Sequence, residues 1–171
     1  MNVRIATAAL LIGAASLAGC KSKAPETLPP AGGAVSTPPP AQNTQPTGPA
    51  VGTQDHFVNA VRGQNVIYFD TDNYTIDSAD AAALQTQAQY LAAYPNLTVT
   101  IEGHADERGT RDYNIALGER RANAAKNYLV SLGVSANRIG TVSYGEERPV
   151  ALGSSPDAWA KNRRAVTVVV N

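Results

Sequence analysis

The stretch that decides the fold runs from residue 103 to residue 122 and reads GHADERGTRDYNIALGERRA. Before it, Leu97, Val99 and Ile101 alternate with polar residues, which is the pattern of a strand with one buried face. The stretch then begins as a charged loop containing glycine and continues as a helical pattern that carries two adjacent arginines. The sequence therefore predicts that a strand end and a helix start meet here, around a polar loop.

Strands and helices alternate along the rest of this region. Apolar runs predict strands at 66–69, 97–101, 139–144 and 166–170. Apolar residues at helical spacing predict one helix that starts after Asp77 and stops before Pro95, and a second that ends at Gly133. A short third helix is predicted to start at Ser155. The order β-α-β-α-β-α-β predicts an α/β fold, more narrowly an α+β two-layer sandwich, with helices packed against one sheet.

Residues 56–171 are predicted to form the folded domain. Phe57, Val58 and Val61 predict one further helical turn that covers an edge of the sheet. This region has 11 Lys and Arg against 12 Asp and Glu, a formal charge of 11 − 12 = −1. A nucleic-acid-binding domain would need a basic surface, so that class of partner is disfavoured.

The first 19 residues have the pattern of a secretory signal peptide. Arg4 supplies a positive charge, and the apolar run from Ile5 to Leu17 is too short to span a membrane. Residues 17–20 read Leu-Ala-Gly-Cys, which resembles a bacterial lipobox, with cleavage before Cys20 and lipid attached to its thiol. Lys21 replaces the aspartate that would favour inner-membrane retention, so an outer-membrane anchor is predicted. The alternative is an ordinary cleaved signal followed by a stray cysteine.

Residues 20–55 are predicted to be a disordered linker. Eight of the eleven prolines of the chain lie between Pro25 and Pro49, and the first 55 residues contain no aromatic side chain. Such a segment cannot bury enough apolar surface to offset the entropy lost on ordering. We interpret it as a spacer between a membrane and the folded domain; a ligand for a proline-binding module is the alternative.

Catalysis is the less favoured interpretation of the polar loop. The chain has no Gly-x-Ser-x-Gly elbow, no phosphate-binding loop and only two histidines. His104, Asp106 and Glu107 could chelate a metal, although all three would come from one short segment. A pair of carboxylates could also act, if Asp70 or Asp72 lay beside Asp106 or Glu107. We therefore predict binding without turnover, and no cofactor or metal.

Asp106 and Arg121 are predicted to lie together, because one follows a strand and the other belongs to the next helix. A carboxylate binds an ammonium group, and a guanidinium binds a carboxylate through two parallel hydrogen bonds. The two side chains would thus suit a zwitterionic ligand. The alternative is an ion pair between the two residues that locks the loop onto the helix.

The polar loop resembles that of a known family. Gly-His-x-Asp at 103–106, Tyr-Asn at 113–114, Arg-Ala at 121–122 and Asn-Arg-Arg at 162–164 resemble the OmpA-like peptidoglycan-binding domains, over about residues 60–171. The resemblance implies a mixed four-stranded sheet and a site for diaminopimelate in the stem peptides of the cell wall. Asp106 and Arg121 match the residues that hold this ligand in the family.

Four more residues are candidates for the site. Asp72 matches a family position whose backbone N–H reaches a ligand carboxylate, although aspartate also favours turns. Tyr113 is expected to pack over the methylene chain of the ligand. Of Arg163 and Arg164, one is expected to face the site and the other to face solvent or the carbonyls at a helix end. A further residue beside these four, Asn114, is expected either to brace the loop or to contact the ligand.

Within the family, the chain resembles the lipid-anchored members that act with the periplasmic propeller protein TolB. The motifs that carry this likeness are Asp-Glu-Arg-Gly-Thr at 106–110 and the run from Val142 to Pro149. The resemblance implies peptidoglycan and TolB as partners, and a role in outer-membrane constriction at division. The alternative is a lipoprotein that scaffolds envelope proteins and has a degenerate wall site.

Overall fold

A computed structural model describes residues 48–170 of the 171-residue chain. The predicted signal peptide, Cys20 and the linker up to residue 47 lie outside these residues. Within them, no helix is both long enough and apolar enough to cross a membrane.

The helices and strands follow the predicted order, with one helix in front. They are α1 (Gln54–Ala60), β1 (Val66–Tyr68), α2 (Ser78–Ala93), β2 (Thr98–His104), α3 (Arg111–Ser131), a 3-10 turn (Ala136–Arg138), β3 (Ile139–Gly145), α4 (Pro156–Asn162) and β4 (Arg164–Val170). Asp77 and Ser155 cap α2 and α4 as their side-chain chemistry predicts. Gly133, at φ +96°, follows the end of α3 in the left-handed conformation that glycine favours.

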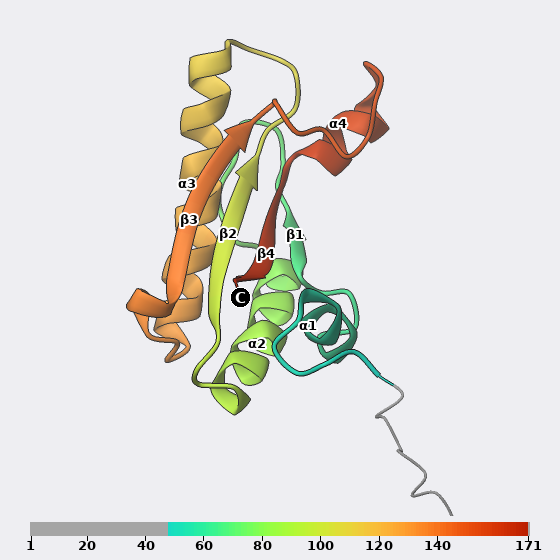
Figure 1. Cartoon of the computed structure of the whole chain (residues 1–171). Coiled ribbons are helices and arrows are strands. Elements are labelled where there is room, and N and C mark those ends of the chain that lie inside the picture. The colour runs from blue at the N-terminus through green and yellow to red at the C-terminus, as the bar shows by residue number, and fades with distance from the viewer. Residues whose placement is uncertain (1–47, 171) are drawn as a thin grey trace, which may run out of the picture. The chain divides into compact units, whose positions relative to one another are not determined.

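The four strands form one mixed sheet in the order β1-β4-β2-β3 (Figure 1). Strands β2 and β3 are parallel because α3 crosses over between them, whereas β4 runs antiparallel to both β1 and β2. Helices α2 and α3 contact each other and pack on the sheet. Leu84 and Leu91 of α2, Leu129 of α3 and Ile101 of β2 are fully buried between these layers. The predicted α/β two-layer fold and its mixed sheet are confirmed.

The predicted additional helical turn is helix α1, and it begins two residues inside the predicted linker. Phe57 and Val61 are fully buried in the main core. The Gln54 side chain donates to the Thr167 carbonyl (3.3 Å) and accepts from the Val169 N–H (2.8 Å). These β4 groups lie beyond Val66, the first residue of β1, so the amide of Gln54 continues the sheet edge ahead of that strand.

Two glycines let α3 approach β2 closely near the predicted site. A Cβ atom on Gly103 would lie 1.8 Å from the Gly118 carbonyl oxygen, and one on Gly118 would lie 2.3 Å from Ser143 Oγ. Neither position has room for a side chain. The close approach places the middle of α3, and therefore Arg121, against the end of β2.

Candidate functional site

A cavity of about 330 Å³ lies where β2 ends and α3 begins. Its walls come from the loop after β1, the loop after β2, the first turns of α3 and the residue between α4 and β4. Five of the six predicted ligand-binding residues line it: Asp72, Asp106, Tyr113, Arg121 and Arg163. Residues from four separate segments are thus brought to one place.

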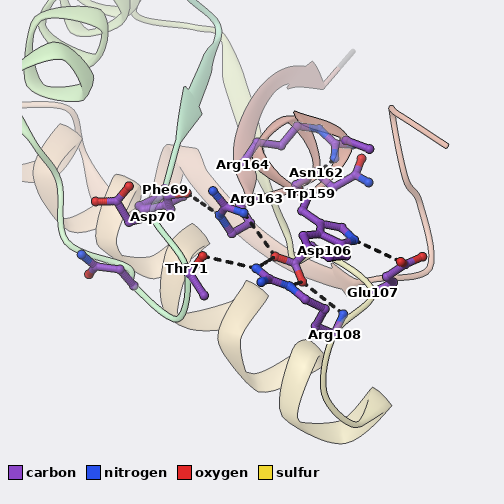
Figure 2. A network of polar contacts seen from close by, with 12 residues as sticks. Phe69, Asp70, Thr71, Asp106, Glu107, Arg108, Trp159, Asn162, Arg163 and Arg164 are labelled. Atoms are coloured by element: carbon purple, nitrogen blue, oxygen red, sulfur yellow. Dashed lines mark hydrogen bonds and ion pairs between the residues drawn. The ribbon is translucent and has the colours of Figure 1, made fainter. Parts of the chain in front are cut away.

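Arg164, the sixth predicted residue, does not line this cavity. Its guanidinium donates to the carbonyls of Asn162 (3.2 Å) and Arg148 (3.1 Å). Arg163 instead donates to the Phe69 carbonyl (2.8 Å) and lies 3.4 Å from Asp106 Oδ2. Figure 2 shows Arg163 directed toward Asp106 and Arg164 directed away from it. Of the two arginines, Arg163 is therefore the one that faces the cavity, whereas Arg164 begins β4 and satisfies the carbonyl at the end of α4.

Asp106 is held by the arginine two residues after it. Arg108 donates from Nε to Oδ1 (2.9 Å), from Nη2 to Oδ2 (2.8 Å) and from its backbone N–H to Oδ1 (3.1 Å). Burial alone would raise the pKa of Asp106, but the hydrogen bonds from Arg108 and Arg163 outweigh burial and hold this pKa below its usual value. The carboxylate is therefore charged at neutral pH.

Arg108 is the residue that sequence reasoning missed. Besides binding Asp106, its guanidinium lies 4.3 Å from the centre of the Trp159 ring and donates to Thr71 Oγ1 (3.2 Å). Trp159 in turn donates to Glu107 (3.0 Å). Arg108 stands in the quoted Asp-Glu-Arg motif, but no helical or strand period indicates which way a loop side chain points.

Arg121 does not touch Asp106 through a hydrogen bond or ion pair in the described part of the chain. It is fully buried, and it donates to the backbone carbonyls of Asn73 (2.8 Å), His104 (2.8 Å) and Asp70 (3.1 Å). Burial, followed by the nearby Arg163, lowers the pKa of Arg121 to about 10, so the side chain remains cationic at neutral pH. The predicted alternative, a locking ion pair with Asp106, is wrong; Arg121 locks the two loops through their backbones instead.

Asp72 adopts a backbone conformation that non-glycine residues rarely use, with φ at +55°. Its side chain accepts a hydrogen bond from the Tyr113 hydroxyl, and Arg121 fixes carbonyls on both sides of it, at Asp70 and Asn73. A left-handed aspartate costs about 1–2 kcal/mol, so the surrounding contacts must maintain it. The turn is therefore held in place on the cavity wall.

Asn114 braces the loop, which is one of the two roles predicted for it. Its Nδ2 donates to the Arg108 carbonyl (3.1 Å) and to the Glu146 carboxylate. Gly109, at φ +107°, allows the loop to turn above it. The backbone at Arg108 is thereby fixed relative to α3.

The catalytic alternatives find no support in these side chains. The described residues contain no group of three or more His, Cys, Asp or Glu side chains that could hold a metal ion. Hydrogen bonds from Ser154 and Trp159 lower the pKa of Glu107, and the pKa of Asp106 is lowered as well. A general acid would need a raised pKa, so neither carboxyl is prepared for that role.

The chain is similar in sequence to known proteins. Residues 68–163 match the model of the OmpA family. The "Peptidoglycan-associated lipoprotein" of Rhizobium meliloti (strain 1021) is 55% identical over 118 residues, which are 69% of this chain and 66% of that protein. The same-named protein of Brucella melitensis biotype 1 is 51% identical over 117 residues, 68% of each chain. The match thus spans about two thirds of each relative.

A solved structure agrees with the fold. The peptidoglycan-associated lipoprotein from Burkholderia pseudomallei superposes with a TM-score of 0.63 at 43% identity, covering 66% of this chain and 96% of that one. The match to residues 68–163, more than half of the chain, and the high identity of the relatives lead to one conclusion: this chain belongs to the OmpA family.

Proposed function

We propose that the cavity beside Asp106 binds the diaminopimelate end of peptidoglycan stem peptides without covalent chemistry. The observation that carries the proposal is a buried, ionised carboxylate set among guanidinium groups in a cavity of about 330 Å³. The free end of diaminopimelate carries one ammonium and one carboxylate, so it matches a site that presents both signs of charge. The relatives named as peptidoglycan-associated lipoproteins support peptidoglycan as the source of the ligand.

The ammonium of the ligand binds Asp106 in this proposal. Arg108 already forms two short side-chain hydrogen bonds with the carboxylate, but the Arg163 contact is long, at 3.4 Å. A carboxylate has about four acceptor positions, so an ammonium can take the place of that long contact without displacing Arg108. Arg163 then turns its free donors toward the ligand carboxylate.

Arg121 and Asp72 serve this site mainly by shaping it. Three hydrogen bonds from Arg121 fix the loop after β1 and the end of β2, and Arg121 itself lines the cavity. Tyr113, whose side chain is partly exposed, covers the apolar stem of the ligand. The ligand thus meets a preorganised surface, which reduces the entropy lost on binding.

At the level of the whole protein, the chain links the outer membrane to the cell wall. Lipid on Cys20 anchors it, the proline-rich linker spans the gap, and the folded domain holds the wall. By analogy with its family it acts in the Tol–Pal system with TolB, supporting envelope integrity and outer-membrane constriction at division. The anchor is tested by Cys20→Ser, which should move the protein from the membrane fraction to the soluble periplasmic fraction. A variant that stays in the membrane pellet would refute the lipid anchor.

Wall binding is tested by sedimentation of the protein with purified sacculi. Asp106→Asn keeps the size of the side chain but removes the charge that faces the ammonium. We expect it to weaken binding by about tenfold or more, because a charge-assisted hydrogen bond contributes about 1.5–3 kcal/mol. Circular dichroism must show that the variant remains folded.

Arg120→Ala is the matched control. Arg120 neighbours Arg121 in α3, but its guanidinium lies near the Tyr74 ring and does not line the cavity. It should bind sacculi nearly as the parent does. Equal binding by Asp106→Asn and the parent would instead favour the second candidate, a scaffold lipoprotein that acts through protein partners.

A further inference from the structure

Trp159 of α4 contacts the wall of the cavity at Asp106 but does not line the cavity itself. It is the single tryptophan of the chain, it is only partly buried, and it is not among the residues of the apolar core. The function proposed above gives it no role. Packing of the core therefore does not explain why a large aromatic side chain stands at this position.

Two contacts join Trp159 to the loop after β2. The guanidinium carbon of Arg108 lies 4.3 Å from the centre of its ring, and the ring Nε1–H donates to Glu107 Oε1 (3.0 Å) (Figure 2). The side chain of Ser154, two residues before α4, also donates to Glu107. The start of α4 thus holds two successive residues of the loop, Glu107 through hydrogen bonds and Arg108 through the aromatic ring.

The Arg108 side chain needs such restraint, because it is 41% exposed and belongs to a loop. A long side chain loses conformational entropy when it is fixed in one orientation. Its Nε and Nη2 donate to the two oxygens of Asp106, and both bonds lie in the plane of the guanidinium group. The ring of Trp159 lies over this group and restricts motion out of that plane. The ring and the carboxylate together therefore fix the orientation of Arg108.

We propose that Trp159 is a positioning residue for wall binding, which holds Arg108 in the orientation that presents the Asp106 carboxylate to the ligand. This inference rests on the proposed function, in which Arg108 stays bonded to Asp106 while the ligand ammonium replaces the contact with Arg163. Because Arg108 takes one acceptor position on each oxygen, it also sets the directions of the positions that remain for the ammonium. The ring thus preorganises the carboxylate before the ligand arrives.

The test is sedimentation with purified sacculi of the whole chain carrying Cys20→Ser, with two substitutions at Trp159. Trp159→Leu removes the aromatic face, and we expect it to weaken binding by about fivefold, which is within the range of a cation–π contact. Trp159→Phe keeps an aromatic face but lacks the Nε1–H, and it should bind within about twofold of the parent. The bonds from Asn162 to the backbone of Val150 and Ala151 anchor α4 independently, so both variants should fold.

NMR of the Arg108 Nε–H group gives a second measurement that needs no ligand. This group donates to Asp106 Oδ1 (2.9 Å), so its proton should exchange slowly with water in the parent. Its signal is assigned by its loss in Arg108→Lys. We expect Trp159→Leu to speed the exchange and Trp159→Phe to restore the slow exchange. A role of Trp159 in general stability would not restore this one signal selectively.

Lys161→Ala is the control, because Lys161 is an exposed residue of the same helix and does not line the cavity at Asp106. It should bind sacculi and protect the Arg108 Nε–H as the parent does. Equal losses in Trp159→Phe and Trp159→Leu, or unchanged exchange in Trp159→Leu, would overturn the inference. Binding by Trp159→Leu like that of the parent, while Asp106→Asn binds weakly, would overturn this inference alone. Binding like that of the parent by both variants would overturn the proposed function as well.

Discussion

Acid should destabilise the domain through His104, and the size of the effect follows from its surroundings. The side chain is 1% exposed, and neither ring nitrogen has a hydrogen-bond partner among the described residues. Burial, followed by repulsion from Arg164 and Arg148, lowers the pKa of His104 to about 4 from 6.5. Glu102 Oε2, 3.7 Å from Nε2, is the one carboxylate near the ring among these residues. Its attraction does not offset burial and the two arginines.

The direction in which stability changes with pH follows from proton linkage. Below pH 6.5 the unfolded chain takes up a proton at His104 that the folded chain does not, so the free energy of unfolding falls as the pH falls. With pKa values of 6.5 unfolded and about 4 folded, the loss between pH 7.5 and pH 5 is about 2 kcal/mol. It reaches about 3 kcal/mol once the pH is well below 4. The part of the stability that depends on a neutral His104 is fully present above about pH 7.

The assay is urea unfolding of the parent and of His104→Phe at pH 7.5 and pH 5. The ring of His104 lies 5.6 Å from that of Tyr144 and forms no hydrogen bond among the described residues, so phenylalanine keeps the ring contact and loses no partner. The parent should lose about 2 kcal/mol more than the variant between the two pH values. Asp80, whose pKa is raised, gains stability in acid, but it is common to both proteins and cancels in the comparison. Equal losses in both would refute the reasoning.

Two further substitutions test how the site is built. Gly103→Ala should lower the free energy of unfolding by about 3 kcal/mol or more, because the added Cβ would lie 1.8 Å from the Gly118 carbonyl oxygen. Gly140→Ala, in the neighbouring strand, is the control, because its nearest contact would be at 3.3 Å. Similar melting temperatures for the two variants would contradict the packing argument. Arg121→Lys keeps the charge but cannot reach three carbonyls with one nitrogen, so unfolding in urea should show a loss of about 2–4 kcal/mol. Full stability with lost sacculus binding would mean that Arg121 acts mainly on the ligand.

The fold could be predicted because its signals are local. Strand alternation, helical spacing and the caps at Asp77, Gly133 and Ser155 each depend on neighbouring residues, and the structure confirms them. The start of the domain could not be predicted in the same way. Gln54 belongs to the fold through bonds to Thr167 and Val169, more than 110 positions away, and no local pattern indicates such a contact.

The sequence predicted which residues line the cavity better than it predicted which of them bind one another. Motif residues from four segments do meet in one cavity, but the guanidinium that grips Asp106 belongs to Arg108, not Arg121. Complementary side-chain charges suggested an Asp106–Arg121 pair, whereas the actual acceptors of Arg121 are backbone carbonyls. Every residue has such a carbonyl, so the sequence holds no signal that marks those three.

This difference changes what a variant at each position can report. Arg121 joins the loop after β1, the end of β2 and helix α3, so its removal would leave three carbonyls without their donor and would release the turn at Asp72. Asp106 contacts mainly its own loop and Arg163, and asparagine keeps one acceptor oxygen, which can retain the two bonds to Oδ1 within the loop but not the two to Oδ2. Loss of binding in an Arg121 variant would therefore confound folding with recognition. Loss of binding in Asp106→Asn, with stability retained, would isolate the charge that meets the ligand.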